Sequence, residues 1–174
     1  MSNQRIGELG ECFVAHCLEQ NGWIILAQRW HCRWGEIDII VQAPAPSQQL
    51  VFVEVKVRHA GNGCGRFNGN WDQSGLLSIT PQKRQKLILA AQTFLSENAG
   101  FANFNCRFDV ALIGYEKRPC GSFWKGPQDS GLTALDSRSD QTFNGVSTPD
   151  WTTVDDQKIE FTIQHYIQGA FDVE

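Results

Sequence analysis

The stretch that decides the fold reads GEIDIIVQ at residues 35–42 and, after a short loop, LVFVEVKVR at residues 50–58. Both segments alternate with period two and are rich in valine and isoleucine, so the sequence predicts two β-strands. If the loop closes as a hairpin, antiparallel pairing places Asp38 directly opposite Glu54. Their carboxylates then lie on one face of the sheet, with Cβ atoms about 5 Å apart.

The same alternation predicts which faces of the two strands are buried, because successive side chains point to opposite sides. One face is wholly apolar and is expected to meet the core; it carries Ile37, Ile39, Val41, Val51, Val53, Val55 and Val57. The other face carries the charged side chains, namely Glu36, Asp38, Glu54, Lys56 and Arg58.

Two carboxylates that face each other repel, so the pair is destabilising unless a positive group lies between them. Lys56 and a divalent cation are the two candidates. Ligands that are all oxygen favour a hard ion such as Mg²⁺ or Mn²⁺. The pattern D-x(15)-E-x-K therefore indicates a site for metal-assisted phosphodiester hydrolysis. The alternative is a solvated strand face with a Glu54–Lys56 pair.

Length and composition suit one soluble globular domain over residues 1–174, of which 41% are hydrophobic and 20% charged. The N-terminus is polar and no apolar run reaches the length of a membrane span. We therefore expect a cytoplasmic protein with no membrane association. Six cysteines show neither CxxC spacing nor a matching histidine pattern, which predicts free thiols rather than structural zinc.

The net charge of −4 is unevenly distributed along the chain. Residues 1–115 carry ten Lys or Arg against nine Asp or Glu, whereas residues 116–174 carry five against ten. Four of the nine acids in the first part belong to the predicted site, so the surface around that site is expected to be basic. A basic surface is typical of nucleic-acid-binding proteins, although many basic patches are only solvated.

A helix is predicted over residues 6–20, where apolar side chains recur at helical spacing. Glu11 lies at the margin of the apolar face, so it is either a third acidic group of the site or an ordinary boundary glutamate. Gly7 and Gly10 also lie on the apolar side. Each costs up to about 1 kcal/mol relative to alanine, which close approach of the helix to the sheet would explain.

A second helix is predicted to begin at Pro81, with Thr80 as its N-cap. Lys83, Arg84 and Lys86 crowd its first two turns, where cations oppose the helix dipole. A bound phosphate backbone would remove this conflict, and a solvated basic face is the alternative.

Weaker patterns predict the strands that complete the sheet. Residues 23–29 predict a first strand, and residues 30–35 a connection whose tryptophans either stack on bases or pack at an edge. Residues 106–115 predict a strand buried on both faces. In that strand, Arg107 and Asp109 either pair with each other or support the site.

Two segments predict irregular structure. Residues 59–75 are rich in glycine and asparagine, and this loop either closes over a substrate, with Arg66 as a contact, or is only a surface loop. Residues 116–157 are rich in Ser, Asp, Gly, Thr and Pro and predict an irregular insertion. A strand at 158–163 and a short helix or turn at 164–171 end the chain.

Six motifs occur in the order and approximate spacing of the YraN family: GELGECFVA, GEIDII, VFVEVKVR, TPQKRQKL, CRFDV and YIQGAF. The chain resembles that family over residues 5–115 and 158–172. The family is similar to the PD-(D/E)XK nucleases, which share a restriction-endonuclease-like fold with Holliday junction resolvases. The resemblance implies an α/β fold, with a mixed sheet flanked by helices in the order α-β-β-β-α-β. Ile37 stands where the conventional nuclease motif has proline.

The resemblance also implies roles for individual residues. Asp38 and Glu54 would ligate Mg²⁺ or Mn²⁺ together with the Val55 carbonyl, and Glu11 would complete the outer ligand set. Lys56 would orient or deprotonate the attacking water. Support is expected from Glu36, Arg107 and Asp109, and nucleic-acid contacts from Arg58, Arg66, Lys83, Arg84 and Lys86.

The expected partner is nucleic acid, DNA before RNA, and the oligomeric state is left open between monomer and homodimer. Two rival functions remain. One is a non-catalytic nucleic-acid-binding module that keeps the fold and the basic surface. The other is a protein-interaction module that docks through the acidic insertion.

Overall fold

The structure is a computed structural model and describes residues 2–59, 79–119, 149, 152–154 and 157–171. In chain order its elements are α1 (Asn3–Gln20), β1 (Ile24–Cys32), β2 (Gly35–Gln42), β3 (Gln49–His59), α3 (Pro81–Glu97), a 3-10 turn (Ala99–Phe101), β4 (Asn105–Pro119), β5 (Thr153–Val154) and β6 (Gln157–Phe171). The described strands form one sheet in the order β1-β2-β3-β4-β6-β5. Of their pairings, only that of β3 with β4 is parallel, so the sheet is mixed, as predicted.

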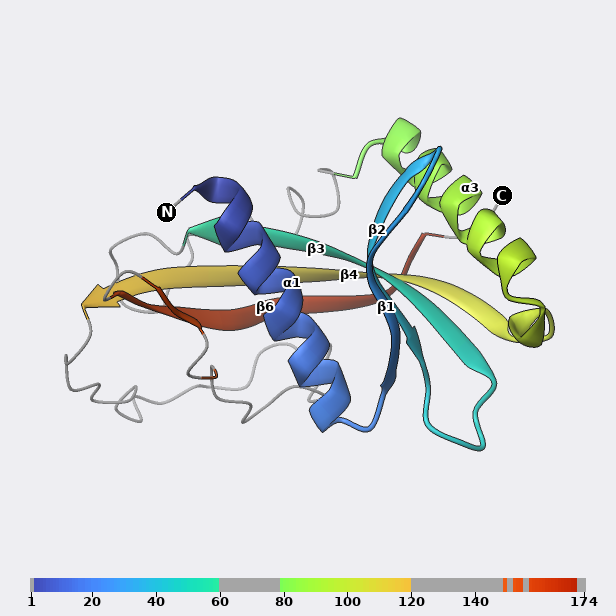
Figure 1. Cartoon of the computed structure of the whole chain (residues 1–174), viewed down its shortest axis with the longest axis horizontal. Coiled ribbons are helices and arrows are strands. Elements are labelled where there is room, and N and C mark those ends of the chain that lie inside the picture. The colour runs from blue at the N-terminus through green and yellow to red at the C-terminus, as the bar shows by residue number, and fades with distance from the viewer. Residues whose placement is uncertain (1, 60–78, 120–148, 150–151, 155–156, 172–174) are drawn as a thin grey trace, which may run out of the picture.

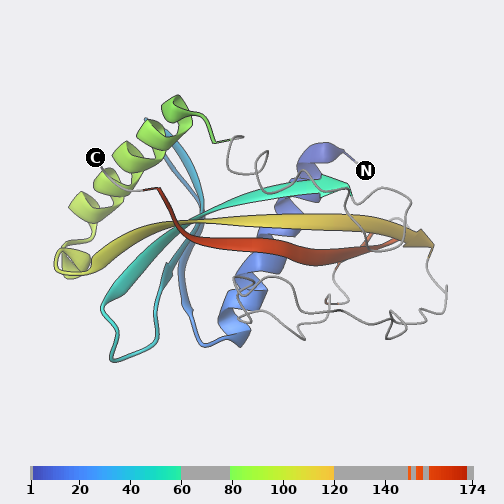
Figure 2. The same cartoon turned by 180° about the vertical axis from the view of Figure 1, so that it is seen from behind.

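Two hydrophobic cores cover the two faces of this sheet. Helix α1 crosses in front of the sheet in Figure 1 and lies behind the strands in Figure 2. Its Leu9 and Phe13 share a core with Val53. Helix α3 places Phe94 in a second core, edge-on to Phe52 at 6.1 Å between ring centroids. The sheet is thus flanked by helices in the order α-β-β-β-α-β, which confirms the predicted restriction-endonuclease-like fold.

Helix α1 begins where its sequence predicts a cap and approaches the sheet at one glycine. The hydroxyl of Ser2 accepts a hydrogen bond from the backbone N–H of Arg5, which satisfies a free donor of the first turn. A Cβ at Gly10 would lie 2.6 Å from Cγ2 of Val57, so only glycine fits this contact without a shift. A Cβ at Gly7 would meet nothing within 4 Å, so close packing explains Gly10 and not Gly7.

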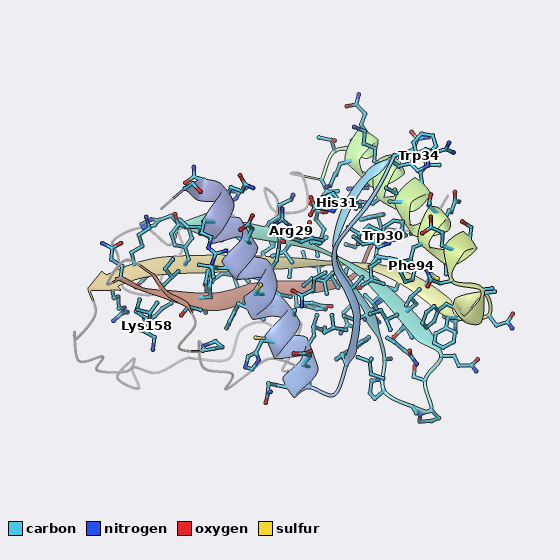
Figure 3. All side chains as sticks on the ribbon, in the orientation of Figure 1. Arg29, Trp30, His31, Trp34, Phe94 and Lys158 are labelled. Carbon is cyan, nitrogen blue, oxygen red and sulfur yellow. The ribbon has the colours of Figure 1, made fainter. Side chains whose placement is uncertain are left out.

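The first strand is longer than the sequence predicts. It continues to Cys32, and the predicted connection at residues 30–35 is mostly a hairpin that turns at Arg33 and Trp34. Trp30 packs edge-on against Phe94 at 5.5 Å, and the guanidinium of Arg33 lies 4.7 Å from the Trp34 ring. Figure 3 shows Trp34 at the hairpin tip beside α3. These tryptophans therefore pack at an edge, which agrees with one of the two predicted alternatives for the segment.

The C-terminal segment differs from its prediction. Residues 164–171 were expected to form a short helix or turn, but β6 runs without interruption to Phe171 and pairs antiparallel with β4. Two register shifts let the strands stay paired, and Gly169 adopts a left-handed φ of +58°. Strand β4 extends to Pro119 and β5 lies at Thr153–Val154, so both ends of the expected insertion contain strand. Residues 120–148 lie outside the described residues.

Ile37 contradicts the simple alternation of β2. The sequence places it on the face of Ile39 and Val41, yet it is fully buried in the α3 core, beside Ile40. Here β2 no longer pairs with β3 and bends with β1 toward α3 (Figure 1). This twist turns the Ile37 side chain toward α3, so period two fails at the end of the strand.

The described residues bear on two further predictions, which concern membrane spans and the cysteines. Neither of its helices has the length and apolar content that crossing a bilayer requires. The four cysteines in that part, Cys12, Cys17, Cys32 and Cys106, are free, as predicted. Burial raises the pKa of the Cys17 thiol to about 12, so this side chain is an inert part of the core.

Candidate functional site

The candidate site lies where β2 and β3 part. Their ladder runs from Gln42 paired with Leu50 to Ile39 paired with Val53 and then stops. Beyond it, the β1–β2 hairpin bends toward α3 while β3 stays in the sheet (Figure 1). Asp38 and Glu54 are the first residues past the last pair, so the register agrees with the predicted juxtaposition. We call these two side chains the carboxylate pair.

Asp38 is held by the backbone of the opposite strand. Its side chain is buried, and Oδ2 accepts a 2.7 Å hydrogen bond from the backbone N–H of Val55. The carboxylate thus takes the place of the strand carbonyl that β2 no longer supplies. Burial and the nearby charge of Glu54 raise the pKa of Asp38 to about 7, against the lowering effect of the Val55 hydrogen bond.

Glu54 is only 3% exposed and lies between two lysines. Its Oε1 accepts a 2.6 Å hydrogen bond from Nζ of Lys56, two residues along β3. Its Oε2 lies 3.2 Å from Nζ of Lys83, an ion-pair distance, but makes no hydrogen bond within the described residues. The Glu54–Lys56 pair is therefore present, yet the alternative of a solvated strand face is wrong because the glutamate is buried.

Lys83 reaches the pair from α3. The Thr80 hydroxyl accepts a hydrogen bond from the Lys83 backbone N–H at 3.2 Å, and Pro81 opens the helix, as the sequence predicts. This cap fixes the first turn and directs the Lys83 side chain toward Glu54. The Glu54 carboxylate thus offsets part of the unfavourable interaction between the Lys83 charge and the dipole of α3.

Glu11 approaches the pair from α1. Burial raises the pKa of Glu11, and the neighbouring guanidinium of Arg29 lowers it by a smaller amount. The nearest cationic atom to Oε2 of Glu11 is Nε of Arg29, at 3.6 Å, and this oxygen makes no hydrogen bond within the described part of the chain. Its charge also acts on Asp38, raising the pKa of that carboxyl. Glu11 therefore borders the site rather than lying at a simple helix boundary.

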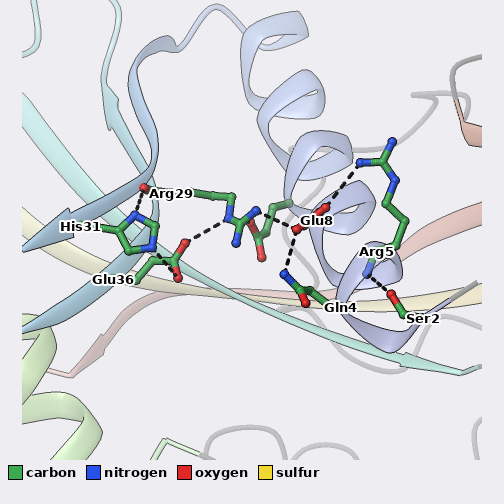
Figure 4. A network of polar contacts seen from close by, with 8 residues as sticks. Ser2, Gln4, Arg5, Glu8, Arg29, His31 and Glu36 are labelled. Atoms are coloured by element: carbon green, nitrogen blue, oxygen red, sulfur yellow. Dashed lines mark hydrogen bonds and ion pairs between the residues drawn. The ribbon is translucent and has the colours of Figure 1, made fainter.

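Arg29 is the centre of a polar network that the sequence did not single out. Its guanidinium donates hydrogen bonds to Glu8 at 2.8 Å and to Glu36 at 3.1 Å (Figure 4). Its backbone has a φ of +50°, a left-handed conformation that is costly for a residue with a side chain. Glu8 and Glu11, three residues apart on one helix, were the available signal that a cation lies opposite them. Glu36 thus supports the site through Arg29.

The other predicted basic residues have different surroundings. Arg84 donates a 3.3 Å hydrogen bond to the Ile79 carbonyl and lies 5.7 Å from the Phe171 ring, so it is engaged within the fold. Lys86 and Arg58 are exposed. Arg66 lies outside the described residues.

Arg107 and Asp109 pair with each other, and the aspartate of this pair is buried. Two guanidinium nitrogens donate to the Asp109 carboxylate at 2.8 and 2.9 Å, and the Gly169 N–H donates to the same group at 2.9 Å. Asp109 is 1% exposed. The contacts tie β4 to β6, so the pairing alternative is confirmed and these residues support the sheet rather than contact the carboxylate pair.

The donor set suits a hard cation, although it is incomplete by itself. Within the described residues no three His, Cys, Asp or Glu side chains are close enough together to hold a metal ion. Two carboxylates and the Val55 carbonyl are nevertheless what Mg²⁺ needs from a protein, since it keeps several water ligands. Among the residues that the structure describes, the buried Oε2 atoms of Glu54 and Glu11 have no hydrogen-bond donor, and such orphaned acceptors fit a cation site.

Comparisons with known proteins give a consistent result. Residues 10–113 match Uncharacterised protein family UPF0102. The chain is 37% identical over 174 residues to a UPF0102 protein of Nostoc sp. (strain PCC 7120), covering 99% of this chain and 97% of the relative. It is 50% identical over 118 residues to a UPF0102 protein of Synechococcus sp. (strain JA-3-3Ab), covering 68% of this chain and 80% of the relative.

Proposed function

We propose that this chain, which belongs to the UPF0102 family, is a metal-dependent nuclease. UPF0102 is the YraN family that the motifs resemble. The reaction would be hydrolysis of a phosphodiester bond in nucleic acid, with branched DNA as the preferred substrate. The observation that carries the proposal is the burial of two facing carboxylates, Asp38 and Glu54, at the fork of two strands with Lys56 beside them.

The cation would be held by Asp38, Glu54 and the Val55 carbonyl, with Glu11 in the outer ligand set. When bound, a divalent ion lowers the pKa of water and offsets charge on the phosphate oxygens. Asp38 is already oriented for this task, because the Val55 N–H fixes one of its oxygens. Because burial raises the pKa of Asp38 to about 7, cation binding near neutral pH would displace a proton from the fraction of molecules in which this carboxyl is protonated.

The two lysines supply the remaining chemistry. Hydrolysis joins a water oxygen to phosphorus, breaks the phosphorus–ester oxygen bond, and moves a proton from the water to the leaving alcohol. Lys56, held by Oε1 of Glu54, would orient that water. Lys83, which contacts Glu54 from the α3 side, would stabilise negative charge on the phosphate.

A cleavage assay tests the proposal. Purified protein is incubated with labelled branched, single-stranded and duplex DNA in Mg²⁺, Mn²⁺ or a chelator. We expect cleavage that needs the metal and falls at least about 100-fold in Asp38→Asn and Lys56→Ala, the range for removal of a catalytic group. Lys158→Ala, which removes a lysine at the far end of the sheet (Figure 3), is the charge-matched control and should cleave as the wild type does. Metal-independent cleavage, or equal rates in all variants, would refute the assignment.

One observation favours a second candidate, a non-catalytic nucleic-acid-binding module. Lys56 and Lys83 already neutralise Glu54, and the described residues contain no three-ligand metal cluster. On this view the lysines balance the buried charge and no ion is needed. DNA binding that weakens steeply with salt, without turnover in either metal, would favour the binding module.

A further inference from the structure

A hollow of about 360 Å³ lies between the N-terminal half of α1 and strands β3 and β4. Among the described residues its walls include Gly7, Glu11, Val55, Arg58, His59 and Tyr115. Glu11 and the backbone of Val55 also belong to the candidate metal site, so the hollow adjoins that site at these two residues. Its volume is at the lower end of the range of roughly 300–1,000 Å³ that holds small organic ligands.

The hollow exists because α1 has no side chain at Gly7. Asn3, Gly7 and Glu11 are four residues apart and form one stripe of the helix, which faces the hollow. One turn further on, Gly10 is packed against Val57 and has no room for a Cβ. Gly7 has free space around it. Glycine inside a helix costs up to about 1 kcal/mol relative to alanine, and at Gly7 the packing of the fold does not require that cost.

The walls combine three kinds of contact. Val55 and Val57 give an apolar floor on β3. The His59 and Tyr115 rings meet edge-to-face at 5.0 Å between centroids, so they form a fixed aromatic corner. Arg58 adds a cation at the rim. An apolar floor, an aromatic wall and a cation are the contacts that bind a nucleobase with its attached phosphate.

We propose that this hollow holds one unpaired nucleobase of the substrate, next to the phosphate that is presented to Asp38 and Glu54. The inference rests on the proposed function and narrows its substrate class. A base inside a duplex is stacked and cannot enter a hollow of this size, whereas a base in a single strand, flap or junction can. The preferred substrate is therefore nucleic acid that is unpaired at the cleavage position.

The test uses the glycine itself. Gly7→Leu fills the hollow and also improves helix propensity, so its folding should be unimpaired. Gly100→Leu introduces the same side chain at another glycine with open space around it, in the 3-10 turn after α3, and is the matched control. Tyr115→Leu removes an aromatic wall but keeps an apolar side chain. Thermal unfolding establishes that each variant folds.

Affinity is measured in a chelator, where no metal-dependent cleavage occurs, by fluorescence anisotropy with a labelled single-stranded oligonucleotide and its duplex. We expect the wild type to favour the single strand. Gly7→Leu and Tyr115→Leu should weaken single-strand binding about tenfold and leave duplex binding unchanged, since stacking on one aromatic residue is worth roughly that factor. Gly100→Leu should bind as the wild type does.

The outcomes distinguish the nucleobase-binding hollow from the nuclease assignment. Folded Gly7→Leu that binds the single strand as tightly as Gly100→Leu overturns the inference and leaves the nuclease assignment standing. Loss of single-strand binding in Gly7→Leu, combined with a wild type that never cleaves, supports the hollow and refutes the nuclease. A wild type that binds neither oligonucleotide overturns both.

Discussion

The backbone N–H of Val55 donates a 2.7 Å hydrogen bond to Oδ2 of Asp38 across the point where β2 and β3 cease to pair. A side chain on one strand thereby replaces the ladder partner that the other strand has lost. The bond holds a carboxylate in a buried position beside Glu54, where its charge is unfavourable. Burial of the Asp38 charge beside Glu54 is locally unfavourable, and such perturbed carboxyl groups are typical of functional sites.

Asp38→Asn should stabilise the protein at neutral and alkaline pH. The pKa of Asp38 is raised in the folded state from 3.8 to about 7, so between these values the folded protein keeps a proton that the unfolded chain has lost. The free energy of unfolding of the wild type therefore falls as pH rises from about 4 to about 7. The amide has no charge to bury and can still accept the Val55 hydrogen bond.

Urea denaturation at pH 4, 6 and 8 measures this effect. We expect equal stability of the two proteins at pH 4 and an advantage for Asp38→Asn on the order of 2–4 kcal/mol at pH 8. A variant that is less stable than the wild type at pH 8 would contradict the charge repulsion.

Divalent cations should narrow this difference in stability. An ion held by the carboxylate pair binds only the folded protein and stabilises it by about 2.7 kcal/mol at a concentration 100 times its dissociation constant. The thermal midpoint of the wild type should therefore rise with Mn²⁺, while that of Asp38→Asn should change little. Glu97→Gln, which removes an exposed carboxylate at the end of α3, is the control and should respond as the wild type does. An equal rise in all three proteins would indicate binding elsewhere.

The two glycines of α1 should respond in opposite directions to alanine. A Cβ at Gly10 would lie 2.6 Å from Val57 and 2.8 Å from Ile113, so Gly10→Ala should cost roughly 1–3 kcal/mol through overpacking. Gly7→Ala meets open space and should stabilise the helix by up to about 1 kcal/mol. Chemical denaturation of both variants is the measurement. Destabilisation by Gly7→Ala would contradict the open space around Gly7.

Arg29→Gly should have a higher thermal midpoint than Arg29→Ala. Within a strand the alanine variant is usually the more stable of the two. Both substitutions remove the cation that Glu8, Glu11 and Glu36 share, so both should lower the thermal midpoint, and less so at high salt. Only alanine must also adopt the left-handed φ of +50°. A higher midpoint for Arg29→Ala than for Arg29→Gly would contradict the backbone conformation.

The sequence predicts the carboxylate pair because local patterns determine it. Period two and a short loop suffice to place Asp38 opposite Glu54, and the cap at Thr80 and Pro81 marks the start of α3. Lys83 could not be assigned to Glu54 in the same way, since their contact depends on how α3 lies against the sheet. Tertiary packing also decided the segment 164–171, where pairing with β4 outweighs an ambiguous local pattern.

Irregular backbone explains the remaining differences. Ile37 faces the α3 core because the hairpin twists after leaving β3, and no alternation of polar and apolar residues records that twist. Arg29 takes a left-handed conformation that its residue type does not favour. In the register of β1 and β2, Arg29 lies across from Asp38 and Ile37 precedes it, so both irregularities adjoin the carboxylate pair.

Anomalous scattering from a crystal grown or soaked in Mn²⁺ tests the central claim most directly. The account predicts an anomalous peak within ligand distance of both the Asp38 and Glu54 carboxylates, with Lys56 or Lys83 displaced from the oxygen that the ion takes. A fully soaked crystal without a peak there, in which both lysines still contact Glu54, would contradict it.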